Sequence, residues 1–192
     1  MIYRSATSRQ ARASLGRTPD LMWASMSDRG ASFAALSASQ MLSCGRCGMG
    51  ASGWDYVTTY RGELASSLAA LHVELFDGGE SYFREELGEW DLPQPATLQE
   101  LRSEPYAEFM EENGTHSILD MPSMEWITPL TSQETQQAFG TDRPTRADWD
   151  RVAGASAEGV WHLVRDTWSG RCVVLFTDEG PDAVAFWGAS GD

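Results

Sequence analysis

The chain has 192 residues, of which 14 are basic and 28 acidic, and every basic residue is an arginine. A formal net charge of -14 excludes nucleic acid as the main partner, because its phosphates would be repelled. The hydrophobic content of 42%, with eight Trp, is enough to build a core and excludes disorder of the whole chain. No segment approaches the roughly 18 apolar residues of a membrane span, so no membrane partner is expected. Three Cys cannot form a disulfide framework and fit a reducing, cytoplasmic compartment.

The charge is distributed unevenly along the chain. Residues 1–48 contain six Arg and two acids, a sum of +4, whereas residues 49–192 contain eight Arg and 26 acids, a sum of -18. The first segment is rich in Ser and Ala, and its apolar residues follow neither helical nor strand periodicity. We expect residues 1–48 to be a disordered extension or to precede a true start at Met49, with a targeting segment or a basic arm as alternatives. Residues 49–192 are expected to form a single acidic globular domain.

The clearest predicted helix covers residues 61–76. A stripe of leucines recurs there at spacings of four, three and four: Leu64, Leu68, Leu71 and Leu75. The pair Gly78-Gly79 ends this helix. By contrast, residues 77–96 are interrupted by Gly and Pro, and we expect an irregular loop that is acidic and aromatic.

Three later helices are predicted from their first residues. A hydroxyl followed three positions later by an acid can form a capping box, and this pattern occurs in segments 97–100, 131–134 and 145–148. Each segment follows a Pro or a Pro-containing loop, which favours the same interpretation. The predicted helices lie near 98–112, 132–139 and 146–153. Apolar residues at spacings of three and four predict a further helix near 157–168.

Strands are fewer than helices. Residues 171–177 and 182–187 flank Asp178-Glu179-Gly180-Pro181, which predicts a C-terminal β-hairpin with a four-residue turn. Residues 116–121 and 126–130 are plausible additional strands, and 54–60 is a possible edge strand. The expected fold class is α+β, with a small mixed or antiparallel sheet flanked by about four or five helices.

From Met49 onward the sequence resembles a family of small uncharacterised bacterial proteins. The resemblance covers nearly all of 49–192 and none of 1–48, and no activity of the family is known, so it implies no functional residue. It depends on four segments: Met49-Gly50-Ala51-Ser52-Gly53-Trp54-Asp55-Tyr56, Gly114-Thr115-His116-Ser117-Ile118-Leu119-Asp120, Phe139-Gly140-Thr141 with Pro144-Thr145-Arg146, and Phe186-Trp187-Gly188-Ala189-Ser190-Gly191-Asp192.

One polar cluster is a candidate catalytic site. His116 and Asp120 are four residues apart, on one face of either a strand or a helix, and a carboxylate can orient an imidazole as a general base. The turn signal Asn113-Gly114 would place His116 at the mouth of an element. In this hypothesis Arg143 or Arg146 binds an anionic substrate. The alternative is structural, with the polar residues capping a turn while their apolar neighbours pack.

Neither a metal site nor a cofactor is predicted. The three histidines, His72, His116 and His162, show no zinc-binding spacing. The pair Cys44 and Cys47 forms an isolated CxxC, and Cys172 lies among apolar residues, as a buried thiol does.

A short tetrapeptide occurs twice. Gly50-Ala51-Ser52-Gly53 recurs as Gly188-Ala189-Ser190-Gly191. A bias toward small residues explains the repeat, and two terminal loops that meet the same surface are the alternative explanation.

The segment around residue 85 is the candidate partner-binding surface. Aromatic residues supply contact area, and a negative field steers a basic partner. The proposed contact residues are Tyr82, Phe83, Glu85, Glu86, Glu89 and Trp90. Further acids follow at Glu104, Glu108, Glu111 and Glu112. The alternative is a solvated acidic face that keeps the protein soluble.

These observations favour a small acidic cytoplasmic binding module, such as an inhibitor or immunity-like protein that sequesters a basic protein. The alternative is a small enzyme that uses His116 and Asp120 as an acid–base pair on an anionic small molecule.

Overall fold

The computed structural model describes residues 52–79, 82–154 and 159–190. The predictions for 1–48, for a start at Met49 and for the CxxC at Cys44 and Cys47 lie outside these residues. The elements in chain order are β1 (Ser52–Thr59), α1 (Leu64–Asp77), α2 (Tyr82–Glu89), α3 (Leu98–Leu101), η1 (Glu104–Tyr106), α4 (Ala107–Glu112), η2 (Ile118–Asp120), β2 (Ile127–Pro129), α5 (Ser132–Phe139), α6 (Arg146–Ala153), η3 (Trp161–Leu163), β3 (Ser169–Thr177) and β4 (Gly180–Ser190).

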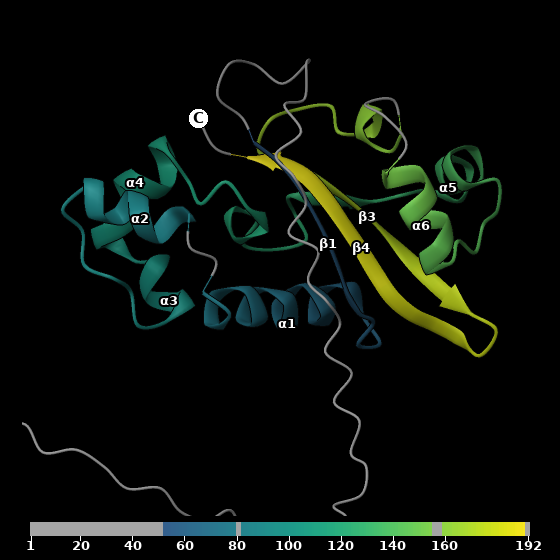
Figure 1. Ribbon diagram of the computed structural model, residues 1–192, viewed down its shortest axis with the longest axis horizontal. Coiled ribbons are helices and arrows are strands. Elements are labelled where there is room, and N and C mark those ends of the chain that lie inside the picture. Colours follow the sequence, from purple (N-terminus) through teal and green to yellow (C-terminus); the bar gives the residue numbers. More distant parts are fainter. Residues whose placement is uncertain (1–51, 80–81, 155–158, 191–192) are drawn as a thin grey trace, which may run out of the picture. The chain divides into compact units, whose positions relative to one another are not determined.

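The four strands form one mixed sheet with the order β1-β4-β3-β2 (Figure 1). β4 pairs antiparallel with both of its neighbours, and the short edge strand β2 runs parallel to β3. The last strand of the described chain is therefore central, with β1 on the opposite edge from β2. The expected α+β class, the C-terminal hairpin and the edge position of β1 are confirmed.

The sheet has an apolar core on each face because side chains alternate along the strands. Val184 and Phe186 of β4 pack in the core that contains residues of α1 to α4 and η2. Ala185 and Trp187 point the other way, into the core that contains residues of α5 and α6. Figure 1 shows these two groups of helices on opposite sides of the sheet. Every residue from 183 to 190 is buried, as expected for a strand covered on both faces.

The predicted helix starts are largely confirmed. α5 and α6 coincide with the predicted ranges 132–139 and 146–153, and each begins with a complete capping box, from Thr131 with Glu134 and from Thr145 with Asp148. The leucine stripe lies in α1. In the described residues, no helix combines the length and apolarity that a bilayer crossing requires.

Two predicted helices are wrong in extent. Residues 98–112 form three short pieces, α3, η1 and α4, because Pro105 lacks an N–H and disfavours a helical conformation of the residue before it. Of the predicted helix 157–168, residues 155–158 are not described, and the described part contains only the short η3. Trp168 has a positive φ of 61°, which ends any helix there.

Three further segments differ from the sequence prediction. Residues 116–121 contain η2 rather than a strand, because Ser117 and Asp120 close a capping box around the turn. The segment 77–96 contains α2, in which Phe83 and Leu87 lie one turn apart and are fully buried. The hairpin turn is shorter than predicted, since Thr177 already pairs with Gly180.

The indole of Trp54 packs directly against the backbone of the sheet. A Cβ atom added at Gly188 would lie 2.4 Å from Cζ2 of Trp54 and 2.5 Å from the carbonyl oxygen of Ser169. A Cβ atom at Gly170 would lie 2.9 Å from Cη2 of the same indole. The two glycines on adjacent strands therefore make the space that Trp54 occupies.

We predict that Gly188→Ala lowers the free energy of unfolding by about 1–3 kcal/mol, because the added methyl group overlaps Trp54 and a backbone carbonyl. The measurement is the urea midpoint of unfolding. Gly88→Ala is the matched control: its methyl group would meet nothing within 4 Å, so this change should raise stability by about 0.5–1 kcal/mol. Equal midpoints for the two variants would contradict the packing argument.

Candidate functional site

The predicted catalytic cluster lies in a loop, residues 114–121, that is buried except at His116. The carboxylate of Asp120 organises this loop. Its Oδ1 accepts hydrogen bonds from the backbone N–H of Thr115 at 2.6 Å and from the Thr115 hydroxyl at 2.8 Å, and Oδ2 accepts from the N–H of Ser117 at 3.4 Å. Burial raises the pKa of Asp120, and the nearby Ser190 hydroxyl together with the hydrogen bonds from Thr115 and Ser117 opposes that shift.

The carbonyl groups of the same loop are satisfied by side chains from distant elements. The hydroxyl of Ser190 on β4 donates to the carbonyl of Ser117 at 3.2 Å, and it accepts from Nε1 of Trp54 at 3.1 Å. Nε2 of His72 on α1 lies 3.0 Å from the carbonyl oxygen of Ile118. A guanidinium nitrogen of Arg102 donates to the carbonyl of Leu119 at 3.2 Å. The buried loop thereby joins α1, β4 and the segment after α3.

His72 is held in its neutral form by this arrangement. Arg102 donates toward Nδ1 of His72 at 3.3 Å, so Nδ1 must accept, and the proton on Nε2 serves the carbonyl of Ile118. Burial, followed by the positive charge of Arg102, lowers the pKa of His72 to about 4, against the opposing hydrogen bond to Ile118. His72 is thus a packed residue of the leucine helix.

His116 differs from the rest of the loop in being partly exposed. It also has a positive φ of 53°, which it shares only with Gly114 among the residues of the loop. Nδ1 of His116 lies 3.0 Å from the hydroxyl oxygen of Ser52, the first residue of β1. The structure therefore places His116 and Asp120 in the same loop with different partners. The Asp120 carboxylate accepts hydrogen bonds from the loop, and the His116 imidazole faces Ser52.

The repeated tetrapeptide contains Ser52, and it is the sequence feature that could have indicated where this serine lies. Within the described residues, Ser52 of the first copy pairs with Ser190 of the second in the β1–β4 ladder, and Gly53 pairs with Ala189. These four residues of the repeat are therefore paired in adjacent strands and do not lie in two terminal loops. The roles of Arg102 and His72 had no comparable signal.

The candidate partner-binding surface belongs to a larger acidic helical segment, residues 82–112, which contains α2, α3, η1 and α4. This segment carries nine acids and two Arg, a sum of -7, or half of the net charge of the chain. Eight of the acids are exposed: Glu85, Glu89, Asp91, Glu100, Glu104, Glu108, Glu111 and Glu112. Figure 1 shows α2, α3 and α4 together at the end of α1.

Both arginines of the acidic helical segment bond to carbonyl groups instead of exposed carboxylates. Arg84 donates to the carbonyl of Phe76 at 3.1 Å, and its guanidinium lies over the rings of Phe76 and Phe83 at 4.8 and 5.0 Å from their centroids. Arg102 donates to Leu119, as described above. The exposed carboxylates of the segment are therefore left without neutralisation by its own cations.

The aromatic residues of the candidate partner-binding surface are more buried than its acidic residues. Phe83 is fully buried in the core, and Trp90 is half-buried with its ring edge-on to Phe109 at 5.7 Å between centroids. Of Tyr82 only the backbone, at the first position of α2, is described. Glu85 and Glu89 are exposed, and Glu86 is half-buried. Among the predicted contact residues whose side chains are described, the exposed ones are thus the carboxylates of Glu85 and Glu89.

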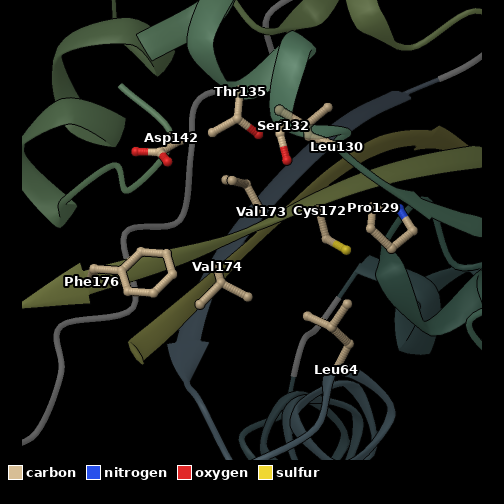
Figure 2. Close-up of a pocket in the computed structure, with 10 residues that line it drawn as sticks. All are labelled: Leu64, Pro129, Leu130, Ser132, Thr135, Asp142, Cys172, Val173, Val174 and Phe176. Carbon is tan, nitrogen blue, oxygen red and sulfur yellow. The ribbon is translucent and has the colours of Figure 1, made fainter. Parts of the chain in front are cut away.

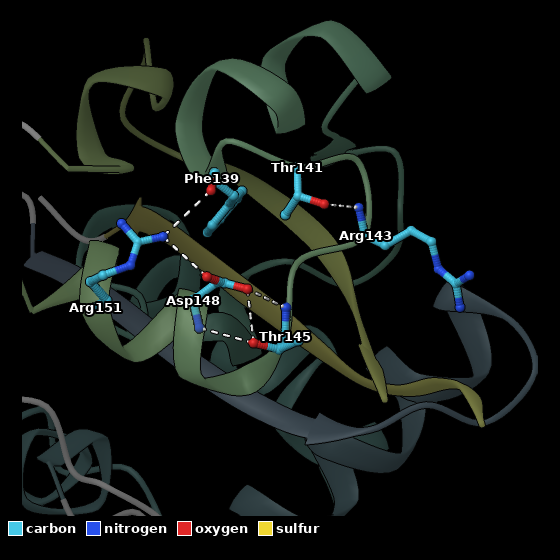
Figure 3. A network of polar contacts seen from close by, with 6 residues as sticks. All are labelled: Phe139, Thr141, Arg143, Thr145, Asp148 and Arg151. Carbon is cyan, nitrogen blue, oxygen red and sulfur yellow. Dashed lines mark hydrogen bonds and ion pairs between the residues drawn. The ribbon is translucent and has the colours of Figure 1, made fainter. Parts of the chain in front are cut away.

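The predicted anion-binding arginines each have a partner within the protein. Arg146 forms an ion pair of 3.0 Å with Asp150 one turn later. The guanidinium of Arg143 lies 4.9 Å from the ring centroid of Phe176. Figure 3 shows that Arg143 extends away from the hydrogen-bonded group around Asp148 and Arg151 at the start of α6.

A cavity of about 190 Å³ lies beside the edge of β3 (Figure 2). β2 is too short to cover this edge. Its last backbone hydrogen bond runs from the N–H of Leu130 to the carbonyl of Cys172, and the next one along β3 runs from the N–H of Phe176 to the carbonyl of Pro144. None of the predicted site residues lines it. Its walls are formed by Leu64, Pro129, Leu130, Ser132, Thr135, Asp142, Cys172, Val173, Val174 and Phe176.

Metal-ligating and thiol chemistry receive no support from the part of the chain that the structure describes. There, no group of three or more His, Cys, Asp or Glu side chains is arranged to hold a metal ion. Cys172 is buried, and burial raises the pKa of its thiol to about 12, which keeps it protonated.

Comparisons with known proteins found no matching family model, no matching curated protein and no matching solved structure.

We predict that the stability of the protein falls as the pH decreases from 6.5 toward 4. In this range the unfolded chain protonates His72 and the folded chain does not, so protons favour unfolding by up to about 3 kcal/mol. Urea midpoints at pH 7 and pH 5 measure the part of this loss that occurs above pH 5.

The control for this prediction is His72→Gln, whose amide can still donate to Ile118 but does not titrate. The raised pKa of Asp120 has the opposite effect on stability, because the folded chain binds a proton there more readily than the unfolded chain. Asp120 is present in both proteins, so its contribution largely cancels from the comparison. His72→Gln should be less stable at pH 7 and lose less stability on acidification. An equal loss in both proteins would show that His72 is not the responsible group.

Proposed function

We propose that the protein is a cytoplasmic binding module that captures a basic protein on the acidic helical segment, residues 82–112. The observation that carries this proposal is the division of charge within the segment. Its two arginines bond to carbonyl groups, and eight of its nine carboxylates are exposed. Such a surface attracts Lys- and Arg-rich proteins and repels nucleic acid and other acidic proteins.

The capture is mainly electrostatic. Phe83 is already buried, so a partner cannot use its ring as an anchor without unfolding α2. The accessible groups are the carboxylates, which accept hydrogen bonds from arginine forks and lysine ammonium groups. Steering by a field of this kind raises association rates and weakens with ionic strength. An inhibitor or immunity-like protein that occludes the basic surface of its target would act in this way.

The alternative of an enzyme with a His116–Asp120 acid–base pair has less support. Asp120 is occupied by Thr115 and Ser117, so its carboxylate has a structural task. An anionic substrate would also approach a protein of strongly negative charge.

The test compares two double charge reversals that change the net charge equally. Glu85→Arg with Glu89→Arg alters the acidic helical segment, and Asp178→Arg with Glu179→Arg alters the exposed turn between β3 and β4. The full chain, tagged, is used to capture proteins from a lysate of the cells that express it, at low and high salt. We expect a basic protein retained by the wild type to bind the first variant at least about tenfold more weakly, because like charges then oppose each other.

The same basic protein should bind the hairpin variant nearly as well as the wild type, and high salt should release it from both. Equal loss in the two variants would mean that only the overall charge matters and that the segment is not a specific surface. Retention of the protein by the Glu85→Arg, Glu89→Arg variant would place the interface elsewhere.

A further inference from the structure

We propose that Ser52 and His116 form a nucleophile–base pair that transfers acyl groups from small activated esters to water. This activity is separate from the proposed capture of a basic protein, because neither residue belongs to the acidic helical segment. The proposal starts from the hydrogen bond of 3.0 Å between the Ser52 hydroxyl and Nδ1 of His116. That distance is within the range over which a histidine can take the proton of a serine nucleophile.

Both groups are accessible to a small molecule. Ser52 and His116 are each partly exposed, whereas the other residues of the 114–121 loop are buried. In the tautomer that carries its proton on Nε2, the imidazole accepts at Nδ1 and the serine hydroxyl donates, which is the arrangement that a general base requires.

The loop holds the imidazole in place by contacts that do not involve the reaction. Asp120 binds the residues on both sides of His116, through the N–H groups of Thr115 and Ser117. The positive φ of His116 is unusual for a residue with a side chain and persists only where neighbouring contacts enforce it. Position 114 requires glycine, since its φ is 71° and a Cβ atom there would lie 2.7 Å from Cη2 of Trp168. An uncommon backbone conformation of this kind is frequent at functional sites.

The backbone beside Ser52 supplies a donor for the developing negative charge. Tyr60 donates to the carbonyl of Asp182 across the β1–β4 pair, so even-numbered residues of β1 direct their backbone groups toward β4. The N–H of Gly53 therefore points to the outer side of this edge strand, directly after the nucleophile. An amide at this position can stabilise the oxyanion of a tetrahedral intermediate.

The reaction has two balanced steps. Oγ of Ser52 attacks the ester carbonyl while Nδ1 of His116 takes the hydroxyl proton; the bond to the leaving alcohol then breaks, and the alcohol takes that proton. In the second step His116 deprotonates a water molecule, which attacks the acyl group on Ser52. The bond to Oγ breaks, a carboxylic acid leaves, and the proton returns to Ser52. No oxidant, reductant or metal is needed.

The first test uses p-nitrophenyl acetate with the full chain. We expect release of p-nitrophenolate together with one acetyl group on the peptide that contains residue 52, identified by mass spectrometry. Ser52→Ala should abolish this acetylation. His116→Asn should slow it about 100-fold, because asparagine tolerates a positive φ but cannot act as a base. Ser169→Ala, which removes a partly exposed serine at the start of β3, is the matched control and should react like the wild type.

A second measurement separates base catalysis from a structural effect of the variants. The thiol introduced by Ser52→Cys should react with iodoacetamide about tenfold faster when His116 is present than in the Ser52→Cys, His116→Asn double variant, since a neighbouring imidazole favours the thiolate. Circular dichroism checks that each variant is folded. The proposal is overturned if acetylation occurs on other residues only, or if His116→Asn changes neither rate.

Discussion

The burial of the loop 114–121 is the constraint on which much of the structure depends. A backbone segment without regular ladders cannot leave its N–H and C=O groups unpaired inside the protein, where each would cost about 1–3 kcal/mol. Asp120 serves the N–H groups of the loop, and Ser190, His72 and Arg102 serve its carbonyls. The polar residues of this part of the core are thus the ones that form hydrogen bonds with the buried loop. His116, which serves none of these groups, is turned outward.

Side chains also serve backbone carbonyls at other places in the structure. Arg84 and Arg151 donate to the carbonyls of Phe76 and Phe139, near the ends of α1 and α5, where the last carbonyls of a helix lack partners within it. Arg102 does the same for the buried loop. Arg84 and Arg102 use their guanidinium groups for these carbonyls, whereas Arg151 also forms an ion pair of 3.1 Å with Asp148. The negative field around α2 to α4 follows from the excess of nine acids over two Arg in residues 82–112.

The sequence predicted those parts of the fold that have local causes. The capping boxes at Thr131 and Thr145 and the leucine stripe of α1 located three helices, and the two β-rich runs located the C-terminal hairpin. α2 was missed because its two buried apolar residues, Phe83 and Leu87, are outnumbered by acids and followed by Gly88.

The site was less predictable because its contacts span the chain. Nothing near His72 indicates that it meets Ile118, 46 positions away, and nothing near Ser52 indicates that it meets His116, 64 positions away. The repeated tetrapeptide was the one long-range signal, and it had a simpler explanation in composition. The turn signal Asn113-Gly114 drew attention to His116, which is partly exposed. The hydroxyl that its ring faces, Ser52, lies on β1, and the predicted pairing with Asp120 did not suggest this contact.

The central position of β4 has a consequence for how the chain acquires its structure. β1 has its ladder partner far along the sequence: Trp54 and Ser190, which are hydrogen-bonded, lie 136 positions apart. During synthesis, β1 and β3 must both wait for β4 before either can complete its pairing, and the faces that α1, α5 and α6 cover remain incomplete until then. Closing so long a loop first is entropically unfavourable, so assembly of the sheet is slow compared with formation of the helices. A nascent chain of this topology exposes its apolar strands until translation has passed β4, and that interval is when it is most open to aggregation and to chaperones.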